Sequence, residues 1–169
     1  MKFEQLRHAL YQNGQRIHFL LEGIPLEQAR WRPDANSWSI LEVVNHLLDE
    51  EREDFRVRLD ITINKPDQAW SAIDPERWVV ERDYNRRDFE TSLKAFMAER
   101  QASLDWLDGL VEPNWDAVYQ APFGPIRAGD LFASWVAHDL LHMRQLIELS
   151  REQSLEAAEP YKTKYAGPW

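Results

Sequence analysis

Residues 131–149 read Leu-Phe-Ala-Ser-Trp-Val-Ala-His-Asp-Leu-Leu-His-Met-Arg-Gln-Leu-Ile-Glu-Leu. This stretch predicts a helix, because its apolar residues recur at helical spacing and neither Gly nor Pro interrupts it. One stripe of the helix carries Leu131, Trp135, His138, Leu141, His142, Gln145 and Leu149. His138 and His142 are four residues apart, so their side chains project from the same face, with about 5 to 6 Å between their Cβ atoms.

The face that carries this histidine pair is expected to point inward. A buried polar group without a partner costs about 1 to 3 kcal/mol, so both imidazoles need hydrogen bonds or a bound ligand. A divalent metal would satisfy both rings at once. The sequence therefore predicts a metal site on this helix.

The composition narrows the classes of protein that fit. The chain has 169 residues, of which 44% are hydrophobic, and this suffices for one core, so we expect a single domain over residues 1–169. The chain has no cysteine, which excludes disulfides, thiolate metal sites and cysteine nucleophiles; a metal must be held by histidine, carboxylate or water. A formal net charge of −9 argues against nucleic acid and anionic membranes as partners, because both attract clustered Lys and Arg.

Neither a targeting segment nor a membrane span is evident. The first eight residues mix charged and apolar side chains without an apolar signal core. We find no uninterrupted apolar run of about 18 residues or more. We therefore expect a soluble, cytoplasmic protein.

Three further helices are expected from apolar periodicity. The first covers about residues 2–22 and ends at Gly23 and Pro25; the connector 24–37 follows it. His8 and His18 lie on this helix, too far apart to share a metal, and we interpret both as surface or hydrogen-bonded residues. The second helix begins with a capping box formed by Ser39 and Glu42 and runs to about Asp60. The third covers about residues 85–108 and carries no histidine.

The remaining segments are expected to be irregular. Residues 61–82 contain Asn and Pro breakers and form a long crossover, a candidate lid or pocket wall. Residues 113–129 form another connector. The tail after Pro160 is expected to pack back through Tyr165 and Trp169.

The second helix contributes two candidate site residues. His46 lies on or beside its inward stripe, and Glu50 follows one turn later. His46 alone fits an ordinary hydrogen-bonded histidine at the core edge, but the histidine pair on the last helix favours a third metal ligand. Glu50 fits a ligand, a hydrogen-bond partner of an imidazole, or a base. It also belongs to the acidic run 49–54, which we expect to be mostly a solvated face.

Four long helices joined by a long crossover predict an all-α four-helix bundle, an architecture that builds metal sites from inward side chains of facing helices. The stretch Ser37-Trp38-Ser39-Ile40-Leu41-Glu42 leads into His46, and Trp135-Val136-Ala137-His138-Asp139 leads into His142, followed by Arg-Gln-Leu-Ile at 144–147. This combination, with the ending Tyr-Ala-Gly-Pro-Trp at 165–169, resembles the DinB/YfiT-like family of metalloenzymes over nearly the whole chain. The segment Arg127-Ala128-Gly129 departs from the Ser or Thr cap of many members, which leaves the start of the last helix open.

The resemblance implies a site and an activity. In that family three histidines hold a divalent metal such as zinc or nickel, and these roles fall on His46, His138 and His142. Some members are transferases that bring a low-molecular-weight thiol such as bacillithiol or mycothiol to an electrophile. Three neutral ligands leave the metal its full charge and an open position, which lowers the pKa of a bound thiol or water. We therefore expect a metal-dependent thiol S-transferase with a small-molecule substrate, and leave a homodimer open.

Two other readings of the same residues stay open. A metal-dependent hydrolase would use Glu50 as its base. His138-Asp139-Leu140-Leu141-His142 has the outline of the zincin motif with Asp in place of Glu, and this shorter carboxylate makes a zincin protease a minor alternative; Asp139 is the second candidate acid-base residue. A stress-related metal-binding protein without activity is the third reading. Imidazole accepts Zn, Ni, Fe, Mn and Co alike, so the sequence does not choose the metal.

Overall fold

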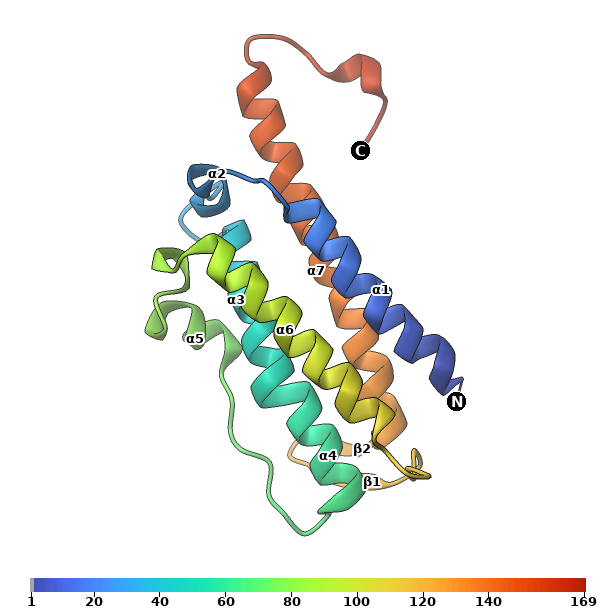
Figure 1. Ribbon diagram of the computed structural model, residues 1–169. Coiled ribbons are helices and arrows are strands. Elements are labelled where there is room, and N and C mark those ends of the chain that lie inside the picture. Colours follow the sequence, from blue (N-terminus) through green and yellow to red (C-terminus); the bar gives the residue numbers. More distant parts are fainter. Residues whose placement is uncertain (1) are drawn as a thin grey trace.

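Four long helical segments pack side by side, and the chain crosses over between the second and the third (Figure 1). The computed structural model describes residues 2–169. The four segments are α1 (Phe3–Leu21), the continuous run α3 (Ile40–Glu50), η1 (Glu51–Phe55) and α4 (Arg56–Asn64), then α6 (Phe89–Asp108) and α7 (Ala128–Ala158). The expected all-α four-helix bundle with a long crossover connection is confirmed.

The second segment begins as the sequence indicates. Ser39 Oγ accepts from the backbone N–H of Glu42 at 3.2 Å, and the Glu42 carboxylate accepts from the backbone N–H of Ser39 at 2.8 Å. This capping box satisfies two N–H groups that the helix cannot pair internally. The segment then passes through a π-helical turn, η1, and continues to Asn64, four residues past the expected end.

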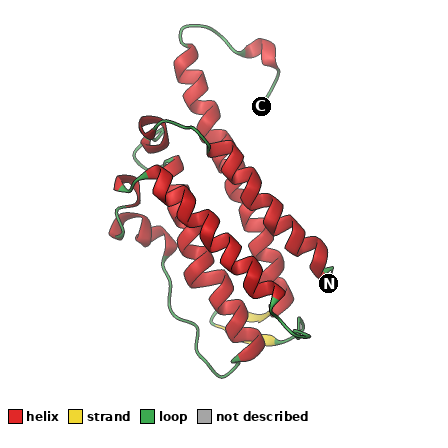
Figure 2. Ribbon diagram, in the orientation of Figure 1, coloured by secondary structure: helices red, strands yellow, loops and turns green. Residues whose placement is uncertain are grey.

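Short elements inside the connectors were not predicted. They are α2 (Leu26–Arg30), α5 (Pro75–Glu81), the 3-10 turn η2 (Tyr84–Arg86) and the antiparallel hairpin of β1 (Val118–Ala121) and β2 (Gly124–Arg127). Each is too short for two turns of helical periodicity or a full alternating strand pattern. Helix α6 consequently starts at Phe89, where the Asp88 side chain accepts from the N–H of Thr91 at 2.8 Å. Figure 2 shows the hairpin at the end of the bundle where α4 stops.

Helix α7 is longer than expected at both ends. Asp130 accepts from the backbone N–H of Arg127 at 3.3 Å, which fixes the start that the sequence left open. The last turns project beyond the other helices, and the tail after them, with the 3-10 turn η3 (Lys164–Ala166), extends away from the bundle (Figure 1). The prediction that the tail packs back is wrong for Tyr165, which is fully exposed; the Trp169 ring is 74% exposed and lies 4.9 Å from the Arg151 guanidinium. Among residues 2–169, no helix combines the length and apolar character needed to span a bilayer.

Two apolar clusters form the core, and a polar layer lies between them. One cluster includes Leu48, Phe96 and Met143, and the other includes Leu104 and Trp135, which is 1% exposed. Many of the buried polar side chains of the bundle lie in this layer: Asn13, His46, Asp49, Glu50, Glu51, Arg100, Asp139 and His142. The helices thus bring the polar residues of the second and last segments to one level.

Candidate metal centre

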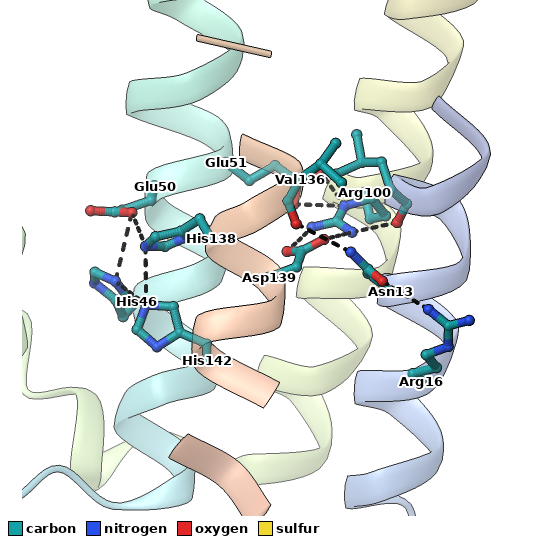
Figure 3. Close-up of polar contacts among 11 residues, drawn as sticks. Asn13, Arg16, His46, Glu50, Glu51, Arg100, Val136, His138, Asp139 and His142 are labelled. Atoms are coloured by element: carbon teal, nitrogen blue, oxygen red, sulfur yellow. Dashed lines mark hydrogen bonds and ion pairs between the residues drawn. The ribbon is translucent and has the colours of Figure 1, made fainter. Parts of the chain in front are cut away.

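Three histidine rings from two helices converge at this level. His46 comes from α3, and His138 and His142 come from α7. The Nε2 atom of His142 lies 3.1 Å from Nε2 of His46 and 3.0 Å from Nε2 of His138. One ligand atom of each ring lies within 4.8 Å of the other two. Figure 3 shows the rings and the Glu50 carboxylate pointing toward one another.

Glu50 lies directly beside this cluster. Its Oε2 atom is 3.0 Å from Nε2 of His138 and 3.6 Å from Nε2 of His46. The spacing of one helical turn between His46 and Glu50 places both on the face of α3 that meets α7. The structure therefore brings together four of the five residues that the sequence singled out.

The donor set fits a metal ion. Nδ1 of His142 lies 2.8 Å from Oε1 of Gln145. With the amide oxygen so assigned, Nδ1 carries the proton and Nε2 presents a lone pair to the cluster. Lone pairs on neighbouring Nε2 atoms cannot bond one another, so the cluster needs a proton or a cation between them. Nitrogens bound to one metal at about 2.1 Å lie about 3.0 to 3.4 Å apart for ligand angles between 90° and tetrahedral, which matches the 3.0 and 3.1 Å observed.

Burial sets the charge of these groups. It lowers the pKa of His46 to about 4, and burial together with the neighbouring histidines lowers the pKa of His142 to about 3. Both rings are therefore neutral at pH 7, the form that binds metals. For Glu50, burial raises the pKa, but the hydrogen bond from His138 and the electrostatic interactions with the histidine cluster outweigh it, so the pKa lies below its ordinary value. The site thus combines neutral nitrogens with an ionised carboxylate.

Aromatic rings and a surface cleft border the cluster. The Trp38 ring lies 4.8 Å from the ring of His46 and stacks parallel to His142 at 6.5 Å, while Phe55 lies 5.1 Å from His138. A cleft of about 550 Å³ reaches His142 and has Trp38, Leu141 and Gln145 among its walls. Leu141, expected on the inward stripe, is 51% exposed and belongs to this cleft. A small molecule can therefore approach the cluster from the His142 side.

The structure does not bring Asp139 to the histidines. It points to the other side of α7, where its two oxygens each accept from Arg100 at 2.8 Å (Figure 3). Consecutive helical residues point about 100° apart, so His138 and Asp139 cannot face the same site. With both oxygens held by Arg100, Asp139 is not available as an acid-base group for this cluster.

The acidic run 49–54 is also not the solvated face that we expected. Asp49, Glu50 and Glu51 are only 3%, 7% and 1% exposed. Asp49 accepts from Tyr84 Oη and from Arg82, both at 2.6 Å, while Glu51 accepts from Arg100. These partners come from distant segments, and a charge run on one helix cannot reveal them.

Two residues of this region were missed by sequence reasoning. Arg100 interrupts the apolar stripe of α6 between Phe96 and Leu104, and this was a signal for a buried charge in need of partners. Trp38 was noted only as part of the start of the second helix, and no spacing rule indicates that its ring contacts two histidines.

These features define a class of protein: a helical bundle with a three-histidine candidate metal site in its interior, next to a cleft. The family model described as the DinB superfamily matches residues 9–146, and the chain belongs to this superfamily, as the resemblance of its motifs predicted. The chain is also similar in fold to YfiT from Bacillus subtilis, described as a probable metal-dependent hydrolase with an unusual four-helix bundle topology. That match has 18% sequence identity and a TM-score of 0.79, and covers 90% of this chain and 88% of YfiT. No curated protein matches the sequence significantly.

Proposed function

We propose that this protein is a divalent-metal-dependent enzyme that transfers a low-molecular-weight thiol to an electrophile. Its metal, zinc or nickel, would be held by His46, His138 and His142. The observation that carries the proposal is the convergence of three Nε2 atoms beside an ionised Glu50, at the edge of a cleft.

The ligand number supports catalysis over a structural role. Structural zinc sites are closed by four protein ligands, whereas catalytic sites commonly use three and keep a position for water or substrate. The two helices that carry the histidines are already held by apolar clusters on both sides of the site. Folding of the bundle therefore has no need of a metal, in contrast to small zinc modules.

Each residue around the site has a separate role in the proposed reaction. When bound, the metal supplies positive charge that lowers the pKa of a thiol or water beside it. The carboxylate of Glu50 accepts the proton when the S–H bond breaks, the sulfur forms a bond to the electrophilic carbon, and the leaving group departs with its electron pair. Gln145 fixes the His142 ring through Nδ1, as hydrogen-bond partners of metal ligands do. The chain has no cysteine, so the sulfur must come from a substrate.

Hydrolysis is the second candidate, and the position of Glu50 favours it as well. An oxygen 3.0 Å from Nε2 of His138 is as well placed to accept a proton from water as from a thiol. YfiT, similar in fold, is described as a probable metal-dependent hydrolase. The two candidates share the site and differ in the nucleophile.

Metal content tests the site. Protein purified without an affinity tag should contain one divalent metal per chain by elemental analysis. Alanine at His138 or His142 should abolish this binding while the circular dichroism stays helical. His8→Ala is the matched control, because His8 is an exposed histidine on α1. Full metal occupancy in either site variant would refute the ligand assignment.

Turnover assays separate the two reactions. The metal-loaded protein is incubated with monochlorobimane and, in turn, bacillithiol, mycothiol, glutathione and coenzyme A, and in parallel with ester and amide substrates lacking any thiol. Thiol-dependent bimane fluorescence that is lost in His142→Ala supports S-transfer. Metal-dependent ester or amide cleavage without thiol conjugation would contradict S-transfer and support hydrolysis.

A further inference from the structure

A single guanidinium lies at the centre of the polar layer and bonds to all the other long segments. Arg100 of α6 is 2% exposed. Its Nε donates to both oxygens of Glu51 at 2.8 and 2.9 Å, and its Nη atoms donate to the two oxygens of Asp139 at 2.8 Å each. Nη1 also donates to the carbonyl oxygen of Leu10 in α1 at 2.7 Å. Figure 3 shows this cluster and the histidines on opposite sides of the same two helices.

The partners of Arg100 are the immediate chain neighbours of site residues. Glu51 follows Glu50, and Asp139 follows His138. Because neighbouring helical residues point about 100° apart, each helix turns one side chain to the histidine cluster and the next to Arg100. A rotation or slide of either helix would move both side chains together, so the bonds to Arg100 restrain the site.

The backbone is irregular at this point. The π-helical turn η1 begins at Glu51, directly after Glu50. A π turn adds a residue to the helical repeat and changes the direction of the side chains that follow. The bifurcated contact of Arg100 Nε with both Glu51 oxygens lies at the start of this turn.

Helix α1 leaves space for the guanidinium. Gly14 faces the Arg100 side chain, and a Cβ atom at this position would lie 3.1 Å from Cγ and 3.4 Å from Nη1 of Arg100. The bundle thus accommodates Arg100 on one side and supplies two carboxylates on the other. Stability alone does not account for this arrangement, because replacing a whole buried ion cluster by apolar side chains is often neutral or stabilising.

We propose that Arg100 is a positioning residue for the metal site: by holding Glu51 and Asp139, it fixes how the His46–Glu50 turn of α3 faces the His138–His142 turn of α7. The ligand identities rest on the proposed function above. Arg100 touches none of the histidines, and its effect is transmitted through the backbones of the two helices.

The decisive variant replaces the whole cluster, since a single change would leave a buried charge unpaired and confound binding with folding. We expect the triple variant Arg100→Met, Glu51→Leu, Asp139→Val to keep or exceed the wild-type melting temperature and to bind metal about 10- to 100-fold more weakly, the loss typical when the supports of ligands are removed. Arg100→Lys should also bind metal more weakly than the wild type, because a lysine cannot form the bidentate contact with Asp139 while it bonds to Glu51.

Arg56→Met is the matched control. Arg56 also joins the second segment to α6, through Ser103 at 3.1 Å and Glu99, but it bonds to no neighbour of a site residue. We expect this variant to lose stability and to retain wild-type metal affinity. Affinities are measured by competition with a chelating dye, and cobalt-substituted protein reports ligand geometry through its visible absorption.

The outcomes separate this inference from the proposed function. A stable triple variant with wild-type metal affinity and cobalt spectrum would overturn the role of Arg100 while leaving the metal site intact. If the wild type itself binds no metal, the proposed function fails, and crystal structures of the two proteins decide the inference. Nε2 atoms that separate in the triple variant support it, and wild-type spacings of 3.0 to 3.1 Å contradict it.

Discussion

Replacement of Glu50 by Gln tests the chemistry of the site with a minimal change of shape. Gln keeps the volume of Glu but removes its charge and its ability to accept a proton. In the structure, Oε2 lies 3.0 Å from Nε2 of His138, and the pKa of Glu50 lies below its ordinary value, so the carboxylate is ionised at neutral pH. Three histidines already provide the usual protein ligands of a catalytic site, which leaves Glu50 as the base.

The expected loss follows from that role. A positioned general base contributes about 10²- to 10⁴-fold to the rate, equivalent to about 3 to 5 kcal/mol of transition-state stabilisation. Glu50→Gln should therefore keep its metal and lose kcat by this factor. The wild-type rate should fall as the pH drops through the pKa of Glu50, because the protonated carboxyl cannot accept a proton, and this acid limb should vanish in the variant.

The assay combines elemental analysis with thiol-conjugation rates measured from pH 8 down to about pH 3, so that the range extends below the ordinary pKa of a glutamate. Glu90→Gln serves as the control, since Glu90 is an exposed acid in the first turn of α6. Loss of metal from Glu50→Gln would show instead that Glu50 is a ligand. Unchanged metal content together with unchanged turnover would refute any role for it.

Three further substitutions test the surroundings of the site. Tyr84→Phe removes the buried hydroxyl that donates to Asp49 at 2.6 Å and should lower the free energy of unfolding by about 1.5 to 3 kcal/mol in urea titrations. Burial raises the pKa of Asp54 from 3.8 to about 6, so the folded metal-free protein keeps this proton at pH values where the unfolded chain has lost it. The stability that the proton provides is lost as the pH rises from about 4 through 6. At pH 8, Asp54→Asn should thus raise the free energy of unfolding by up to about 3 kcal/mol and raise the melting temperature. At pH 3 it should change both little. Gly14→Ala should destabilise by about 1 to 3 kcal/mol in the same titrations, because Arg100 is anchored and cannot yield to the new methyl group.

Local periodicity was enough to predict the bundle and the histidine pair of the last helix. The helical spacing of His138 and His142 put both rings on one face, and the capping box at Ser39 set the start of the helix that carries His46. These features depend on residues within a few positions of one another, so a sequence displays them directly. The family resemblance then joined His46 to the pair.

Tertiary structure decided which charged residues are buried and which partners they bond. Asp139 has the position of a catalytic carboxylate in the motif and the acidic run looks solvated, but the first bonds Arg100 and most of the second is buried. The partners lie 39 residues away for Asp139 and 49 residues away for Glu51. Periodicity shows which face of a helix is apolar, yet it does not show which distant helix packs there or which charges that helix brings.

The short elements show the same limit. The hairpin of β1 and β2, helix α5 and the π turn η1 gain their stability from contacts with the bundle, since each is too short to form alone. The sequence determined the long helices, their caps and the face that carries the histidines, because these follow from local spacing. Only the folded chain decided that Glu50 faces the histidines while Glu51, its neighbour, faces Arg100, because that choice depends on how α3, α6 and α7 are rotated against one another.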